Sequence, residues 1–94
     1  MRAFVGPLTR DLADAALVMA QAELLAWRGN NPKGLKCSVD LTSLEQVDTS
    51  ALAVVLGLQR YARSLGFELV WIAMPAALLE LAKLSSVDRL IARA

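Results

Sequence analysis

Apolar and polar side chains alternate most regularly between residues 35 and 41. Every second side chain in this stretch is apolar, namely Leu35, Cys37, Val39 and Leu41. A period of two is typical of a β-strand that buries one face and exposes the other. The pattern therefore predicts a central strand whose odd-numbered side chains lie in the core.

A helical period follows directly after residue 50. Apolar residues recur there at spacings of four and three, at Ala51, Val55, Leu58, Ala62 and Leu65. Such spacings align side chains along one side of a helix. The corner between strand and helix contains Asp48, Thr49 and Ser50, whose short oxygen-bearing side chains suit the unpaired N–H groups at a helix start. We expect the Thr49 hydroxyl to cap this helix and Asp48 to accept hydrogen bonds within the corner.

Weaker signals before the central strand predict one further strand and one further helix. Residues 2–5 predict a short strand that stops at the turn residues Gly6 and Pro7. Thr9 is expected to cap the first helix. The apolar stripe of that helix consists of Ala13, Leu17, Ala20, Leu24 and Trp27. Turn residues at positions 29–34 are expected to end the helix in an exposed loop.

The last third of the chain repeats the alternation of elements. Gly66 is expected to end the second helix, and residues 67–72 alternate as a further strand in which Trp71 is buried. Pro75 is expected to open a third helix. This helix packs through the apolar residues Leu78, Leu81 and Ala82. A serine pair at positions 85–86 is expected to cap a final short turn.

Strands that alternate with helices predict an α/β fold, in one domain that covers residues 1–94. Right-handed crossovers through the helices would make the later strands parallel. Because the central strand alternates instead of being continuously apolar, only one sheet face is expected to be fully covered. We therefore predict a small mixed or parallel β-sheet that is covered mainly on one face by three to four helices.

Composition narrows the range of functions. The 94 residues carry a net charge of +1 and their Lys and Arg residues are scattered, so the chain lacks the basic patch that nucleic-acid binding needs. There is no His, a single Cys and no glycine-rich phosphate loop, so the usual catalytic and metal-binding constellations are missing. We expect neither enzymatic activity nor a cofactor. Cys37 is expected to be a buried thiol in a reducing compartment.

The apolar runs of the sequence are short. The longest, residues 51–58, is far below the roughly 20 residues that cross a bilayer. Charged residues also interrupt the N-terminal region where a signal peptide would have its apolar stretch. The chain is therefore expected to be soluble and cytoplasmic.

The residues around the corner resemble a known family. The sequence VDL at 39–41, the leucine at 44 and VDTSALA at 47–53 are similar to the STAS domain, whose hallmark is an Asp-Ser/Thr corner between a strand and the following helix. The stretches at 75–84 and 87–91 resemble the MlaB-like branch of that superfamily. The resemblance covers residues 6–91 and implies a STAS-like fold.

The resemblance also implies a function. MlaB-like proteins are small cytoplasmic subunits of the Mla phospholipid-transport ABC complex of Gram-negative bacteria. This chain would then be a non-catalytic subunit that binds and regulates or stabilises the MlaF-like ATPase of a transporter that maintains outer-membrane lipid asymmetry. The complex would also contain a permease and a periplasmic lipid-binding subunit, and would hold the chain at the inner face of the inner membrane. A second copy of the chain, in a homodimer, is a further candidate partner.

A second function is implied by other members of the superfamily. Anti-sigma-factor antagonists are signalling switches that are phosphorylated on Ser or Thr at the corner, and Thr49 matches that position, with Asp48 and Ser50 beside it. Many antagonists carry Gly two residues after the phosphorylated residue, where this chain has Ala51. Neighbouring genes would separate the two functions, because a transporter subunit should lie beside an ATPase and a permease, and a switch beside a serine kinase.

The sequence also predicts a place for the partner. Residues 51–56 are apolar on all sides of the helix, so Leu52 and Leu56 lie away from the core stripe and would form an exposed apolar patch beside the corner. Arg60 and Arg63 would supply its polar rim. The alternative is that the third helix covers both leucines, because a small domain has little core to spare.

Overall fold

Helices and parallel strands are interspersed along the chain, which confirms the predicted α/β class. The computed structural model describes residues 4–29, 31, 34–91 and 93. Their elements are β1 (Gly6–Leu8), α1 (Ala13–Gly29), β2 (Lys36–Asp40), β3 (Leu44–Val47), α2 (Thr49–Ser64), β4 (Glu68–Ile72), α3 (Ala76–Leu84) and the short 3-10 helix η1 (Asp88–Leu90).

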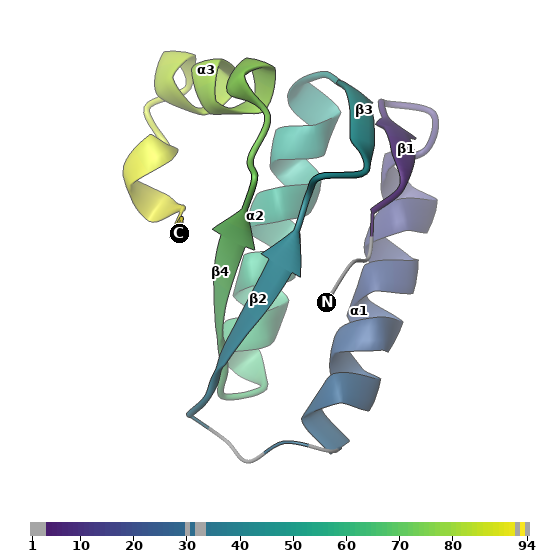
Figure 1. Ribbon diagram of the computed structural model, residues 1–94, viewed down its shortest axis with the longest axis vertical. Helices are drawn as coiled ribbons and strands as arrows, with labels where there is room; N and C mark the ends of the chain where they lie inside the picture. The colour runs from purple at the N-terminus through teal and green to yellow at the C-terminus, as the bar shows by residue number, and fades with distance from the viewer. Residues whose placement is uncertain (1–3, 30, 32–33, 92, 94) are drawn as a thin grey trace.

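The strands pair in parallel, as two small sheets of two strands each. β2 pairs with β4 from Lys36 opposite Glu68 to Asp40 opposite Ile72, and β1 pairs with β3. A tight turn separates β2 from β3, because the Leu44 N–H donates to the carbonyl of Leu41 at 3.0 Å. β3 therefore continues the course of β2 toward β1 (Figure 1).

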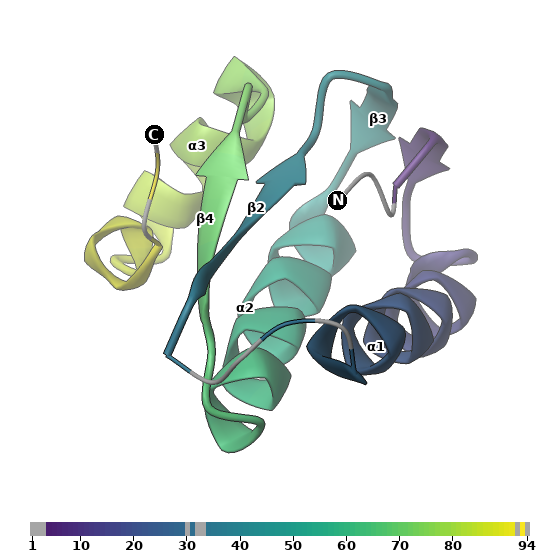
Figure 2. The same ribbon diagram turned by 60° about the horizontal axis from the view of Figure 1, so that its bottom comes forward.

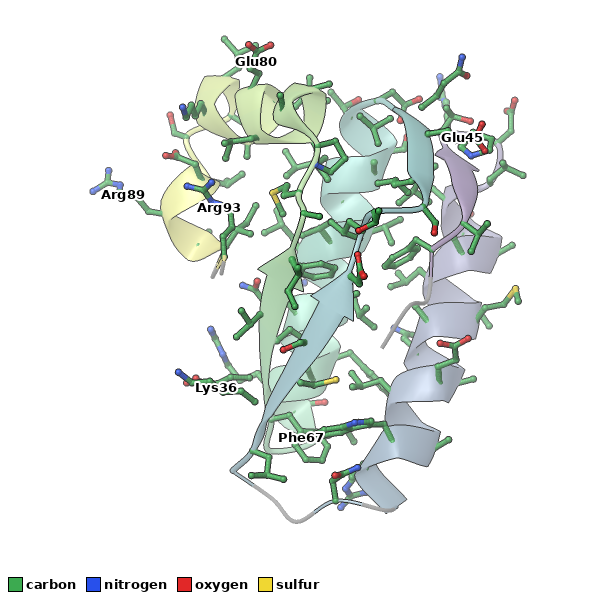
Figure 3. All side chains as sticks on the ribbon, viewed as in Figure 1. Lys36, Glu45, Phe67, Glu80, Arg89 and Arg93 are labelled. Atoms are coloured by element: carbon green, nitrogen blue, oxygen red, sulfur yellow. The ribbon has the colours of Figure 1, made fainter. Side chains whose placement is uncertain are left out.

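Helices cover one face of the β2–β4 pair. Figures 1 and 2 place α1 and α2 on the same side of the two strands, while α3 and η1 lie beside β4. The side chains that point to α2 are buried, namely Cys37, Val39, Leu69 and Trp71. Their neighbours along each strand are exposed or half-buried, and Lys36 points outward from β2 (Figure 3). The prediction of one fully covered face is confirmed.

The core forms where the predicted apolar stripes meet. Ala51, Val55, Leu58 and Ala62 of α2 are fully buried against the sheet. Trp71 is fully buried and stacks on Phe4 with ring centroids 6.5 Å apart. Trp27 is half-buried and meets Phe67 edge to face, with ring centroids 4.8 Å apart. Phe67 lies near the lower ends of the strands (Figure 3). Both tryptophans therefore pack in the core, as predicted, and so does Cys37, whose burial raises the pKa of its thiol.

The expected ends of α2 and α3 are largely confirmed. Gly66 follows α2 with φ +90°, and the N–H groups of Gly66 and Phe67 donate to the carbonyls of Arg63 (3.1 Å) and Ala62 (2.9 Å). These two bonds form a Schellman motif, in which glycine adopts the left-handed conformation at little cost. Pro75 is the N-cap of α3.

Several expected boundaries are wrong. The first strand is Gly6–Leu8, whereas Phe4 and Val5 precede it and residues 2 and 3 lie outside the described part of the chain. Gly6 and Pro7 do not end the strand. The Gly6 N–H donates to the carbonyl of Ser43 at 2.9 Å, and the missing N–H of proline is tolerated on an edge strand.

The start of α1 also differs from the prediction. The helix begins at Ala13 and not after Thr9, because the N–H of Leu12 donates to the carbonyl of Thr9 at 3.0 Å and closes a separate turn.

Two smaller expectations fail near strand and helix ends. Leu35 is 42% exposed and lies just before β2, so the buried alternation begins only at Cys37. The serine pair does not cap η1. Val87 is its N-cap and makes no side-chain cap bond. The serines instead belong to the end of α3, where Ser86 has φ 58° and the Val87 N–H donates to the carbonyl of Ala82 at 2.9 Å.

Candidate functional site

The corner between β3 and α2 is organised by Asp48. This residue has an extended backbone (φ −136°, ψ −168°) and is the N-cap of α2. One carboxylate oxygen, Oδ1, accepts a hydrogen bond from the Ser50 N–H at 2.8 Å, and Oδ2 accepts one from the Arg10 N–H at 3.0 Å. The carboxylate therefore caps α2 and also ties it to the segment that leads into α1.

Thr49 is not the capping residue, contrary to the expectation from sequence. It is the first residue of α2 and its side chain is exposed. A capping side chain must come from the residue before the first helical one, where the backbone is still extended, and Asp48 occupies that position. The hydroxyl of Thr49 is thus on the surface at the start of a 16-residue helix.

The hydrogen bonds at the corner set the charge state of Asp48. Desolvation of the carboxyl favours a higher pKa, but hydrogen bonds from the backbone N–H groups of Arg10, Ser50 and Ala51 and from the Ser50 side chain outweigh it. Together they lower the pKa below its ordinary value. Asp48 is therefore an anion at neutral pH, at the end of the helix where the dipole favours negative charge.

A hollow lies beside the corner, between α1 and α2. It has a volume of about 340 Å³ and is lined by Arg10, Ala13, Asp14, Leu17, Ser50, Ala53 and Val54. Ser50 is half-buried at its edge. Asp48 and Ser50 form a hydrogen-bonded pair, and Thr49 is the exposed member of the three corner residues.

The predicted apolar patch on α2 is only partly present. Leu52 is 6% exposed and belongs to the core, so its expected exposure is wrong, and the alternative of a covered leucine holds at this position. It lies two turns before Gln59 on the same side of the helix, and this is the side on which α2 packs against α3 and η1. Leu56 is half-buried.

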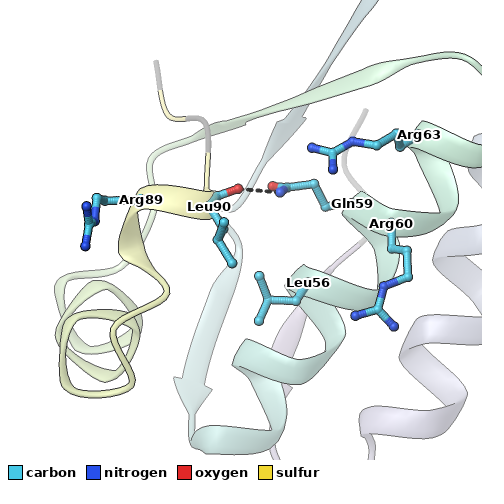
Figure 4. A pocket seen from close by; sticks show the side chains of 6 residues that line it. All are labelled: Leu56, Gln59, Arg60, Arg63, Arg89 and Leu90. Carbon is cyan, nitrogen blue, oxygen red and sulfur yellow. Dashed lines mark hydrogen bonds between the residues drawn. The ribbon is translucent and has the colours of Figure 1, made fainter.

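Leu56 lines a groove between α2 and η1 that the sequence did not predict. The groove has a volume of about 310 Å³, and its lining residues are Leu56, Gln59, Arg60, Arg63, Arg89 and Leu90. All the charged residues in this lining are arginines. In Figure 4 the side chains of Leu56 and Leu90 point toward each other, Arg60 and Arg63 extend from α2, and Arg89 extends from the far side of η1.

Gln59 holds the two walls of this groove together. Its Nε2 donates to the carbonyl of Leu90, and its Oε1 accepts from the indole N–H of Trp71 at 3.1 Å. Arg60 and Arg63 were expected to form a polar rim, and the structure places both beside the half-buried Leu56. Arg89 and Leu90 were missed because they lie about thirty residues further along the chain, in a turn that only tertiary contacts bring here.

Neither a metal-binding group nor a membrane-spanning helix is found among the described residues. Within the ranges that the structure describes, no three His, Cys, Asp or Glu side chains gather into a group that could hold a metal ion. None of the helices in those ranges is long and apolar enough to cross a membrane.

Comparison with known protein families gives a match over most of the chain. A protein-family model described as "Mlab, STAS domain" matches residues 9–92. The matched range contains the Asp48 corner and every residue that lines the groove between α2 and η1. No curated protein matches the chain.

Proposed function

Since this chain belongs to the family of MlaB-like STAS domains, we propose that it is a non-catalytic subunit that binds and regulates or stabilises the ATPase of an Mla-type ABC transporter. The transporter would move phospholipids and maintain outer-membrane lipid asymmetry. The family match over residues 9–92 is the observation that carries the proposal. The chain would be attached to the inner membrane only through the ATPase and permease.

Two surface features support a role in binding. The first is the exposed Thr49 side chain, which lies at the start of α2 on the corner that the hydrogen bonds of Asp48 hold together. The second is the groove between α2 and η1, where Leu56 and Leu90 form an apolar centre with arginines around it. An apolar centre with a polar rim is the usual anatomy of a protein interface. Arginine is also frequent among the residues that dominate binding energy.

We propose that Thr49, Leu56, Arg60 and Arg63 contact the ATPase. Leu52 has no direct part in this contact because it is buried. It supports the position of its neighbour Leu56. The arginines would meet acidic groups on the ATPase, which speeds association and fixes the orientation of the two proteins.

The experiment is a pull-down with the Mla-type ATPase encoded beside this chain, after both proteins are co-expressed. The unmodified chain should retain the ATPase. Arg60→Glu and Arg63→Glu should each weaken its retention about tenfold or more, because each puts a negative charge where a positive one is needed. Lys83→Glu is the matched control, since Lys83 is exposed on α3 and does not line the groove. Failure of the unmodified chain to retain the ATPase would contradict the proposal.

The exposure of Thr49 also favours the second function, a phosphorylatable antagonist of an anti-sigma factor. A phosphate on this hydroxyl would add a charge of about −1.5 to −2 beside the Asp48 carboxylate and so change what the corner can bind. Intact-mass measurement of the chain purified from its own organism separates the two functions. A phosphorylated fraction that disappears in Thr49→Ala would favour the switch, and an unmodified mass favours the transporter subunit.

A further inference from the structure

The outer side of α1 is an apolar surface that no described residue covers. The helix buries Ala20 and Leu24 against the core. On the opposite side its exposed residues are apolar except for Glu23, and the apolar ones are Ala15, Val18, Met19, Ala22, Leu25 and Ala26. Val18 is 64% exposed, Met19 66% and Leu25 48%. A helix at the surface of a domain normally has a polar outer side, so the run of exposed apolar side chains on α1 has the composition of an interface.

The apolar surface continues from α1 onto the edge strand β1. A hollow of about 230 Å³ separates the two elements, and all the residues that line it are apolar, including Val5, Leu8, Leu12 and Met19. Val5 is 75% exposed and Leu12 45%. The exposed apolar area is therefore larger than the scattered single residues that are normal on a protein surface.

The charges of α1 indicate what covers this surface. The helix has three charged residues, Asp14 in its first turn, Glu23, and Arg28 in its last turn. Asp14 and Arg28 are fourteen positions apart, which at 3.6 residues per turn places them about 40° apart around the axis, on the same flank. Each end of one flank thus has one charge, with opposite signs at the two ends.

We propose that the chain forms a homodimer in which the α1 helices of two copies pack antiparallel around a two-fold axis near the middle of the helix. This arrangement places Asp14 of each copy beside Arg28 of the other, so that both ion pairs form at once. A parallel pair would instead bring like charges to the same end. The antiparallel pair also brings Val18 of each copy to Leu25 of the other, and Ala15 to Ala26, whose small side chains allow close approach.

This interface is separate from the groove between α2 and η1. α1 and η1 lie on opposite sides of α2 (Figure 1), so Arg60 and Arg63 stay accessible in the dimer. The inference therefore goes beyond the proposed function, and the oligomeric state of the isolated chain tests it without the ATPase.

Analytical ultracentrifugation of the purified chain over a range of concentrations is the test. The unmodified chain should pass from monomer to dimer as its concentration rises. Val18→Asp, a change at an exposed position, should weaken the dimer at least tenfold while circular dichroism stays that of the folded chain. A chain that stays monomeric, or a dimer that Val18→Asp does not weaken, would overturn the proposal.

Charge exchange tests the antiparallel arrangement. Asp14→Arg and Arg28→Asp should each weaken dimerisation several-fold, because each puts like charges together, and the double variant Asp14→Arg/Arg28→Asp should restore it. Each change destabilises α1, because it puts a positive charge at the N-terminus or a negative charge at the C-terminus of the helix dipole. Recovery of the dimer in the double variant therefore cannot come from a more stable helix. A double variant as weak as either single one would overturn the arrangement. Loss of ATPase retention in Val18→Asp, with no dimer in the unmodified chain, would assign this surface to the ATPase instead.

Discussion

At the scale of single residues, the Asp48 carboxylate joins three segments of the chain. It follows β3, it caps α2 through the Ser50 N–H, and it accepts a hydrogen bond from the Arg10 N–H ahead of α1. The side chain that a partner would meet at this corner is Thr49, the next residue. Structural support and surface exposure are thus divided between two neighbouring residues.

This division predicts different effects for two alanine variants. Asp48→Ala should lower the melting temperature clearly, because the first turn of α2 and the Arg10 N–H both lose an acceptor. Thr49→Ala should change the free energy of unfolding by no more than about 0.5 kcal/mol, because its side chain is exposed and no cap is lost. Thermal and urea unfolding of both variants are the measurements. A Thr49→Ala loss as large as that of Asp48→Ala would show that the threonine hydroxyl supports the corner.

The pKa of Asp48 predicts the pH dependence of stability. Because the folded chain holds this pKa below its ordinary value, the unfolded chain binds the proton more readily and stability increases with pH. The contribution is complete above the ordinary aspartate pKa of about 3.9. It is lost as the pH falls through the folded value. Melting temperatures of the unmodified chain and of Asp48→Asn should therefore differ by a constant amount near pH 7 and converge in strong acid. A constant difference across the whole range would contradict this.

At the scale of elements, α2 is held by specific contacts at both ends and by its buried stripe. The N-terminal end has the Asp48 cap, and the C-terminal end has the Schellman motif at Gly66. Between them, residues of the stripe are fully buried. Both exposed features proposed for partner binding therefore involve a helix that is anchored at its two ends and along its buried side.

Substitution of Gly66 tests the C-terminal anchor. Gly66→Ala should lower the free energy of unfolding by about 1–2 kcal/mol, the cost of a β-carbon in the left-handed conformation that its φ of +90° requires. Gly29→Ala is the matched control at the end of α1, because an added β-carbon there meets no atom within 4 Å. It should leave stability unchanged or slightly raised. Equal losses in the two variants, measured by urea unfolding, would contradict the role given to Gly66.

Leu52 and Leu56 are neighbours on α2 that should respond differently to truncation. Leu52→Ala should cost about 2–5 kcal/mol, the range for a leucine removed from a core, because Leu52 is only 6% exposed. Leu56→Ala should cost clearly less, because Leu56 is half-buried at the wall of the groove. Urea unfolding measures both. Similar losses would mean that Leu56 is as much a part of the core as Leu52.

How much of these elements the sequence predicts depends on their local pattern. The regular alternation of apolar residues predicts β2 and β4, and the helical spacing predicts the buried sides of the helices. The structure confirms these elements. β1 and β3 have three and four residues, too short for a period to be read. They are strands because they pair with each other across more than thirty residues of chain. The position of the cap was missed because Asp, Thr and Ser are all good caps, and only backbone geometry distinguishes them.

At the scale of the whole molecule, the described residues form two surfaces, on opposite sides of α2, that no other described residue covers. One is the groove between α2 and η1, and the other is the outer side of α1. The sequence predicted part of the groove, namely Leu56, Arg60 and Arg63, and did not predict the apolar outer side of α1. The alternation of apolar residues shows which side of an element is buried, but an apolar residue on its other side gives no local sign of what covers it. Two such surfaces suit a subunit that joins other proteins.

The central claim is that the chain binds and regulates or stabilises the ATPase of an Mla-type transporter. The rate of ATP hydrolysis by that transporter tests this claim most directly. The transporter encoded beside this chain would be purified with it and without it, and hydrolysis measured at equal ATPase concentration. The proposal predicts that omission of the chain lowers the rate or the stability of the complex. The proposal also predicts that adding back the unmodified chain restores the lost rate or stability. Adding back the double variant Arg60→Glu/Arg63→Glu should not restore either. A transporter that hydrolyses ATP equally fast and is equally stable with and without the chain would contradict the claim.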